Sequence, residues 1–422
     1  MDDIRVTLRI LWLALLLCSS LRAEVSLLAY GEIPPSAKDS LGDTVGGLGS
    51  AVCYDRTTDC VFMMPDRGAG DGNIDYRPRC FRIKVSRNPK NPARLDAHVE
   101  ETILFRDKNG RTFSGLLPDT AAAPTREGRR CLDPEAISVA PDGTLYVSDE
   151  YGPSLMHFNR SGKLLREIPL PDWYRPRDEH NNLDYRTNRK LLSGRDENRG
   201  AEAMGILPDG KHAVMIFQSA LVQDGGKPAG TSRILILDLR SGAPVAEYPY
   251  AFGPAPEKFS DLSVNDLTVV DAHTFLVLER DSLGRDGPLA HSVARYKSIW
   301  LVDTRGAANL LAIKGQPYDK SPADAAFKPI RRSADTKFVS KKLLFNLPNL
   351  VPQLNMRAEN LAAKWEGITQ LPPKSKRDFR LLMTADNDFL NPVLTFDGIR
   401  TRFPRAQDAV PTQFFEILAS RP

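Results

Sequence analysis

The chain has 422 residues, a net charge of +4 and a mean hydropathy of −0.33, so it is long enough to bury a large core. Its lysines and arginines are scattered, with no basic stripe interleaved with aromatic residues, which argues against a nucleic-acid-binding protein.

The first 23 residues predict a cleavable signal peptide. Arg5 and Arg9 precede a short apolar segment over residues 10–17, and Leu21-Arg22-Ala23 ends in a small residue suited to cleavage. The apolar segment is too short to span a bilayer. We therefore expect a leader over 1–23, a mature domain over 24–422 in the periplasm or outside the cell, and no transmembrane segment after processing. The acidic residues at positions 2 and 3 leave an uncleaved anchor as the alternative.

The mature chain keeps four cysteines: Cys53, Cys60, Cys80 and Cys131. An even number in an exported chain predicts two disulfides, although four cysteines allow three pairings. Cys53 and Cys60 flank a polar turn between two apolar runs, so the favoured pairing is Cys53 with Cys60 and Cys80 with Cys131.

A repeated pattern along the chain predicts the fold. In three places an acid begins an apolar strand that ends in a proline turn, starting at Glu135, Glu202 and Glu366. Asp266 begins a fourth copy, and Gly46-Gly47-Leu48 begins a degenerate fifth. Short strands and Gly/Asp turns in units of this kind indicate an all-β protein, a single β-propeller of four-stranded blades.

The number of blades stays open between five and six. Five repeats can be counted, and residues 304–365 have room for a sixth, irregular blade. The first mature strand, over residues 25–30, is expected to pair into the last blade and close the ring.

Polar clusters follow the second strand of each unit. They are Asp66-Arg67, Asp149-Glu150, Gln218-Ser219, Glu279-Arg280-Asp281 and Asp386-Asn387-Asp388. Because consecutive strands of a blade are antiparallel, the start of the first strand and the end of the second lie at the same rim. The predicted connections at that rim are also the long ones, and long loops on a rigid scaffold commonly carry the site.

Carboxylates gathered near one axis would repel one another unless cations neutralise them. Oxygen ligands without a histidine or cysteine cluster favour Ca²⁺, with Mg²⁺ as the alternative. The predicted ligands are Glu135, Asp149, Glu150, Glu202, Asp266, Glu279, Asp281, Glu366, Asp386 and Asp388. The structural alternative is that such acids cap backbone N–H groups or pair with arginines of neighbouring blades.

Six motifs stand in the order seen in the phytase-like propeller family, which is described as having esterase-like activity of phytase. They are Gly46-Gly47-Leu48, Asp133-Pro134-Glu135-Ala136-Ile137, Arg199-Gly200-Ala201-Glu202-Ala203, Glu279-Arg280-Asp281, Glu366-Gly367-Ile368 and Asp386-Asn387-Asp388-Phe389. The resemblance covers nearly the whole mature chain. It implies a propeller and Ca²⁺-dependent hydrolysis of phosphate esters. The chain departs from the family pattern at Gln218, where many relatives carry an acid.

The sequence thus favours metal-assisted hydrolysis of a small-molecule phosphate ester. The predicted catalytic residues are Glu135, Glu202, Glu366, Arg67 and Arg280, with the two arginines gripping phosphate or, equally, pairing with the carboxylates. No Gly-x-Ser-x-Gly motif supports a serine esterase. Two alternatives remain: a Ca²⁺-dependent lactonase or carboxylic-ester hydrolase, and a non-catalytic binding propeller stabilised by Ca²⁺. The oligomeric state stays open.

Overall fold

The structure is a computed structural model that describes residues 24–254, 261–287, 292–312, 337–402 and 409–422. The predicted leader over 1–23 lies outside the described residues. Within the described part of the chain, no helix is both long and apolar enough to cross a membrane.

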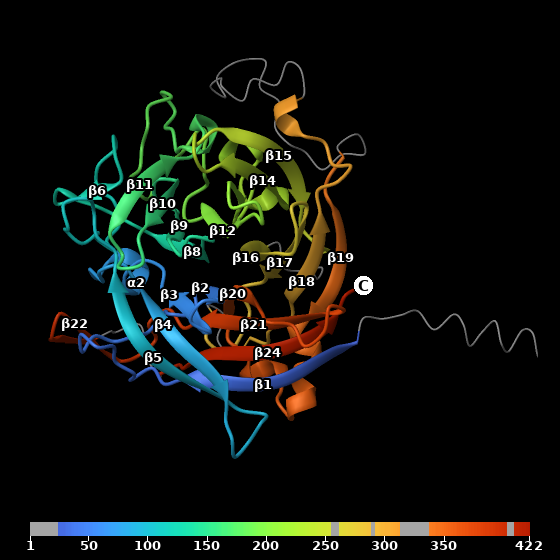
Figure 1. The fold of residues 1–422 in the computed structure, drawn as a ribbon. Helices are drawn as coiled ribbons and strands as arrows, with labels where there is room; N and C mark the ends of the chain where they lie inside the picture. Colours follow the sequence, from blue (N-terminus) through green and yellow to red (C-terminus); the bar gives the residue numbers. More distant parts are fainter. Residues whose placement is uncertain (1–23, 255–260, 288–291, 313–336, 403–408) are drawn as a thin grey trace, which may run out of the picture.

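Five four-stranded antiparallel sheets surround a central axis, and they are the blades of a propeller (Figure 1). The predicted fold is confirmed, with five blades. From the axis outward, blade 1 contains β2 (Ala51–Asp55), β3 (Cys60–Met64), β4 (Arg79–Arg87) and β5 (Leu95–Leu104). Blade 2 contains β8 (Pro134–Val139), β9 (Leu145–Asp149), β10 (Ser154–Phe158) and β11 (Leu164–Pro169). Blade 3 contains β12 (Ala201–Ile206), β13 (His212–Phe217), β14 (Thr231–Asp238) and β15 (Pro244–Ala251).

Blade 4 contains β16 (Ser263–Val269), β17 (Thr274–Arg280), β18 (Lys297–Asp303) and β19 (Ser340–Asn346). The region that had room for a sixth blade therefore supplies the last strand of blade 4. The third strand, β18, ends at Asp303, and the fourth, β19, begins only at Ser340.

The two ends of the chain meet in blade 5, as predicted. This blade contains β20 (Lys364–Leu371), β21 (Asp378–Asp386), β24 (Thr412–Ser420) and β1 (Val25–Ile33). The first described strand, β1, pairs antiparallel with the last, β24, from Val25 opposite Ala419 to Ile33 opposite Thr412. This pairing ties the ring shut through backbone hydrogen bonds.

Burial explains where each strand lies. The second strands are apolar runs buried on both faces, as in β3 and β17, where every residue is buried. The outermost strands alternate buried and exposed positions, as in β11, because one face packs on the neighbouring blade and the other meets solvent.

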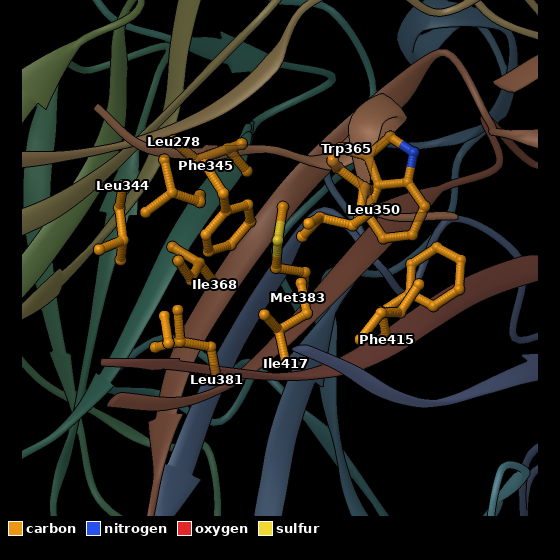
Figure 2. Packing of buried hydrophobic residues seen from close by; sticks show 14 of the residues in the cluster. Leu278, Leu344, Phe345, Leu350, Trp365, Ile368, Leu381, Met383, Phe415 and Ile417 are labelled. Carbon is orange, nitrogen blue, oxygen red and sulfur yellow. The ribbon is translucent and has the colours of Figure 1, made fainter. Parts of the chain in front are cut away.

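Apolar side chains from neighbouring blades fill the space between the sheets. Figure 2 shows this packing between blades 4 and 5, where Leu278 and Phe345 of blade 4 lie near Ile368 and Met383 of blade 5. The Trp365 ring stacks on Phe415 with centroids 5.0 Å apart. The Trp365–Phe415 pair joins two strands of blade 5, whereas the contacts of Leu278 and Phe345 with blade 5 hold the two blades together.

The irregular elements belong mostly to the long connections at one rim. They are α2 (Ala69–Gly72), the hairpins β6–β7 (Thr125–Arg126, Arg129–Arg130) and β22–β23 (Val393–Phe396, Ile399–Arg402), and the 3₁₀ turns η1 (Asp172–Tyr174), η2 (Val222–Asp224), η3 (Lys227–Ala229), η4 (Leu310–Ala312), η5 (Leu347–Asn349), η6 (Val351–Leu354) and η7 (Ala358–Asn360).

The four cysteines are free thiols in the structure, so the predicted disulfides are not formed. In the β2–β3 hairpin, Cys53 lies opposite Phe62 and Cys60 lies opposite Asp55, so the two cysteines are offset rather than paired. The Cys53 sulfur instead accepts a hydrogen bond from the backbone N–H of Val139 in blade 2.

Candidate metal and substrate site

Acidic side chains reach the axis through a break in the register of the inner strands. Glu202 is the extra residue between the paired Ala201 and Ala203, and Glu366 is the extra residue of blade 5. Glu135 lies within the corresponding break of blade 2. A β-bulge redirects the side chain of the extra residue. All three glutamates line one cavity at the rim with the long loops.

The equivalent residue of blade 4 is Asn265 and not the predicted Asp266. The register breaks between Val264 and Asp266, so Asn265 is the extra residue, and its amide donates to Glu202 at 3.1 Å. Asp266 is buried away from the cavity and accepts the backbone N–H groups of Leu267 and Ile368 at 2.7 and 2.8 Å. The predicted ligand of this unit, Asp266, is therefore one residue beyond the position that is equivalent to Glu135, Glu202 and Glu366.

The second strand of each blade places one polar residue at this rim, the one with the long loops. The backbone N–H of Glu150 donates to Asp133 in blade 2, and that of Gln218 donates to Gly200 in blade 3, both at 2.9 Å. Arg280 and Asp386 hold the corresponding places opposite Ser263 and Lys364. In blade 1, continuing the β2–β3 register past the end of β3 places Asp66 at the equivalent position, two residues beyond the strand.

The resulting cavity has a volume of about 340 Å³. Eight of its lining residues carry carboxyl groups: Asp66, Glu135, Glu150, Glu202, Asp261, Asp286, Glu366 and Asp388. Four carry permanent positive charge: Arg67, Arg199, Arg280 and Lys364. The lining thus has an excess of negative charge.

Each of the cationic residues lies beside a carboxylate. Arg67 donates to Asp133 at 2.5 Å and to Glu150 at 3.4 Å, and Arg280 donates to Glu366 at 2.5 Å. Arg199 pairs with Asp261 at 3.1 Å. The predicted pairing role of Arg67 and Arg280 is therefore what the geometry shows.

Two cavity carboxylates are left without such support. Glu135 is buried, yet among the described residues it has neither a hydrogen bond nor an ion pair. Within the part of the chain that the structure describes, Asp66 reaches only the Lys364 ammonium, 4.0 Å away. Oxygen atoms of Asp66, Asp133 and Glu135 lie within 4.8 Å of one another. Three converging carboxylates, one of them buried and unpartnered, form a donor set that fits a hard divalent cation.

Burial and mutual repulsion shift the protonation of this cluster. Burial, reinforced by the charge of Glu202, raises the pKa of Glu135 well above its ordinary value. Burial likewise raises the pKa of Asp66 and of Glu202. The pKa of Glu150 rises to about 7, because burial and Asp133 outweigh the opposing charge of Arg67. Without a cation the cluster thus holds protons at pH values where an exposed carboxyl has lost its own.

Three other predicted ligands point away from the cavity. Asp149 accepts the backbone N–H groups of Tyr151 and Gly152 and pairs with Arg130. Glu279 accepts the hydroxyl groups of Tyr250 and Tyr296, and Asp281 binds the Lys297 ammonium. These acids accept hydrogen bonds from backbone N–H groups and tyrosine hydroxyls or pair with basic residues. This is the structural alternative to metal binding that the sequence left open.

Two residues that shape the site were not among the predicted ligands. Asp133 and Lys364 each stand two residues before the bulged glutamate of their blade, and each lies opposite the polar end of the second strand. Lys364 donates to Asp386 at 2.9 Å and to Asp388 at 2.6 Å. Their shared spacing to Glu135 and Glu366 was the available clue.

A second hollow of about 430 Å³ adjoins the cavity and shares Arg67, Glu150 and Asn198 with it. Its wall contains four arginines and three acids, so positive groups are in slight excess: Arg67, Arg186, Arg189 and Arg195 against Asp71, Glu150 and Glu197. Arg195 is buried, and its Nε atom has no hydrogen-bond partner among the described residues. Arg186 pairs with Asp184, whereas Arg189 has no hydrogen bond or ion pair within the described chain. This basic hollow borders the acidic cavity directly.

Comparisons with known proteins identify relatives of the chain. A secreted protein of Arthroderma benhamiae, described as uncharacterized, is 26% identical over 465 residues, which include 90% of each chain. Among solved structures, Kuenenia stuttgartiensis hydrazine synthase aligns at 14% identity and a TM-score of 0.30, over 62% of this chain and 65%, just under two thirds, of the other. The model of the phytase-like family, described as esterase-like activity of phytase, matches residues 43–389. The protein therefore belongs to the phytase-like family.

Proposed function

We propose that the protein is an exported, Ca²⁺-dependent hydrolase of small-molecule phosphate esters. The observation that carries the proposal is the convergence of Asp66, Asp133 and Glu135, with Glu135 buried and unpartnered. The family membership and the secreted relative support the reaction class and the export.

Asp66, Asp133 and Glu135 are the residues that would hold the cation, from blades 1 and 2. A Ca²⁺ ion bound there would supply positive charge next to the ester and would make a nearby water more acidic. Glu202 faces the same cavity and is fixed by the amide groups of Gln218 and Asn265. Glu366 is fixed by Arg280 and by the Ser50 hydroxyl. These two glutamates shape the wall of the cavity and accept hydrogen bonds from the substrate.

The basic hollow favours an anionic substrate over a neutral lactone. Arg189 and Arg195 offer guanidinium groups that no carboxylate engages through an ion pair in the described chain, and planar guanidinium donors match phosphate oxygens. An ester whose reacting phosphate lies in the acidic cavity would place its remaining anionic groups toward these arginines.

The test is phosphate release by the purified mature protein, with phytate and simple phosphomonoesters as substrates. Activity is expected with Ca²⁺ and is expected to be lost in excess chelator and restored when Ca²⁺ is added back. A folded protein that binds Ca²⁺ but releases no phosphate from any of these esters would overturn the proposal. Parallel assays on lactones and carboxylic esters show whether the reaction is instead carbonyl-ester cleavage.

Arg189 provides a sharper probe of substrate charge. We expect Arg189→Gln to raise KM for a polyphosphorylated ester by about tenfold, because about 1.4 kcal/mol of binding is lost with one charge-assisted contact. Arg186→Gln is the matched control, since its guanidinium is already neutralised by Asp184. Equal KM values for wild type and Arg189→Gln would exclude this hollow from substrate binding.

A further inference from the structure

Two groups of carboxylates at the cavity wall share Asp66, and each also contains one aspartate buried behind the wall. The first is Asp66 with Asp133 and Glu135, and the second is Asp66 with Asp386 and Asp388. In both groups the oxygen atoms lie within 4.8 Å of one another. By ligand type both groups suit a divalent cation, but they differ in their cationic contacts: Arg67 donates to only one member of the first group, Asp133, whereas the second group has Lys364.

Equivalent strand positions carry opposite charges in the two groups. In blade 2 the residue two places before the bulged Glu135 is Asp133, opposite Glu150. In blade 5 the residue two places before the bulged Glu366 is Lys364, opposite Asp386. One blade therefore supplies a carboxylate at this position and the other supplies an ammonium group.

The Lys364 ammonium lies inside the second group. It is 2.9 Å from Asp386, 2.6 Å from Asp388 and 4.0 Å from Asp66, and it is also 3.7 Å from Glu366. It therefore contacts or approaches every member of that group. A metal ion that used the same three carboxylates would have to occupy the same volume, because Ca²⁺ binds its oxygen ligands at about 2.3–2.6 Å.

We propose that Lys364 is a built-in cation that replaces a second divalent metal ion, so that the protein binds divalent ions only at the Asp66, Asp133 and Glu135 group. The ammonium offers three N–H donors to the surrounding oxygens and neutralises part of their charge. The second group is thereby held together without an ion from solution, and Asp66 stays positioned for the first group.

The test is the number of Ca²⁺ ions bound by wild type and by Lys364→Met, measured by equilibrium dialysis and calorimetry on the mature protein. Methionine keeps most of the length of the side chain, without the terminal ammonium group, and so removes the charge. The variant is expected to bind one ion more than wild type, and Ca²⁺ is expected to raise its melting temperature by more than it raises that of wild type. An unchanged ion count in a folded variant would overturn the proposal.

Two further variants keep the test decisive. Lys364→Arg retains the positive charge and is expected to keep the wild-type ion count. Lys364→Met combined with Asp388→Ala relieves the repulsion and removes one ligand, so this folded double variant is expected to lose the extra ion. An extra ion that persists in the double variant would place it outside the second group and would also overturn the proposal.

The proposal names the first group as the site of the wild-type ion, and in that respect it rests on the proposed function. The two can still fail separately, because the gain of one ion in Lys364→Met is counted relative to wild type. If wild type binds no ion and the variant binds one, the role of Lys364 stands while the proposed Ca²⁺-dependent hydrolysis fails.

Discussion

Glu135 is the residue whose energetics most constrain the site. The Glu135 carboxylate is largely buried, faces the cavity and has no side-chain partner among the described residues, so burial favours its protonated form or a bound cation over the bare charge. Its place within the register break of β8 aims it into the cavity rather than toward the neighbouring strand. Glu135 therefore destabilises the metal-free protein and contributes to its affinity for a cation.

We expect Glu135→Gln to weaken Ca²⁺ binding at least tenfold and to abolish phosphate release. In excess chelator the variant is expected to be more stable than wild type by about 1 kcal/mol, because the repulsion with Glu202 and Asp133 is relieved. Calorimetric titration with Ca²⁺ and thermal unfolding in chelator check the two effects.

Asp266→Asn is the matched control for Glu135→Gln. Asp266 is also a buried inner-strand acid, but its oxygens accept two backbone N–H groups outside the cavity. Its replacement is expected to cost about 1–2 kcal/mol of unfolding free energy and to leave the Ca²⁺ affinity unchanged. A loss of Ca²⁺ binding in Asp266→Asn would restore the ligand role that the sequence suggested.

For single residues, the sequence predicted the site where the same residue type recurs at the same place in the repeat, as for Glu135, Glu202 and Glu366. It failed for Asp266 because Asn265 and Asp266 are adjacent polar residues, and the bulge that selects between them depends on strand pairing. It also failed for Asp149 and Glu279, since each stands one residue before the rim position of its blade, Glu150 or Arg280, and points away from the cavity. Lys364 was overlooked because a lysine is not a metal ligand.

The connection between the β1–β2 segment and the end of β21 shows how whole elements position the site. The Asn387 side chain accepts the backbone N–H groups of Gly47 and Phe389, at 2.6 and 3.1 Å. Phe389 packs against Tyr76, with ring centroids 4.9 Å apart. Asp388 and Phe389 both have positive φ angles, 50° and 54°. Two sequence motifs far apart in the chain thus hold Asp388 at the rim of the cavity.

We expect Gly47→Ala to destabilise the protein by about 2–4 kcal/mol. A β-carbon at Gly47 would lie 2.7 Å from the Phe389 ring, at a φ of +79°. Gly42→Ala is the matched control, because Gly42 has a φ of +82° and no atom within 4 Å of the added carbon. Its cost is expected to be about 1 kcal/mol. Equal melting temperatures for the two variants would show that the Phe389 contact does not matter.

The order of elements was predictable because each unit repeats the same strand and turn pattern. The register within an element was not, and the cysteines show the consequence. The polar turn after β2 correctly indicated a hairpin, but the pairing of Cys60 with Asp55 offsets the two sulfur-bearing positions. Likewise, the sequence showed no sign that residues 304–339 separate the last two strands of blade 4.

For the whole molecule, closure of the ring depends on β1. Its backbone pairs with β24, and its buried Leu27, Ala29 and Ile33 pack against blades 5 and 1. Removal of residues 24–33 would expose the edge of β24 and these core surfaces. The expected loss is several kcal/mol, a large part of a typical net stability of about 5–15 kcal/mol.

We therefore expect a mature chain that begins at residue 34 to unfold at a much lower temperature than wild type, or to aggregate through the open edge. A peptide of residues 24–33 added in excess is expected to raise the melting temperature, as an added strand would. A peptide with Leu27 and Ile33 replaced by Asp is the control. A truncated chain as stable as wild type would contradict the role of β1 in closure.

The acidic cavity also governs how the stability of the whole molecule depends on pH. Burial raises the pKa of Glu135 and of Glu202, and that of Glu150 to about 7, whereas an unfolded glutamate titrates near about 4.3. Between these values the folded protein binds more protons than the unfolded chain, so its unfolding free energy falls as pH rises. The favourable contribution is complete below about pH 4 and is lost as pH passes through the raised values.

In excess chelator, the melting temperature is therefore expected to fall by several degrees between pH 5 and pH 8, which corresponds to roughly 1–3 kcal/mol. Saturating Ca²⁺ is expected to reverse most of this fall, because the ion binds the deprotonated carboxylates and its stabilisation grows as protons leave. The two melting curves should converge near pH 5 and diverge toward pH 8. Parallel curves across this range would mean that the ion binds away from the titrating cluster. The Glu135→Gln variant lacks one of the carboxyl groups whose pKa is raised, so its melting temperature in chelator should depend less on pH.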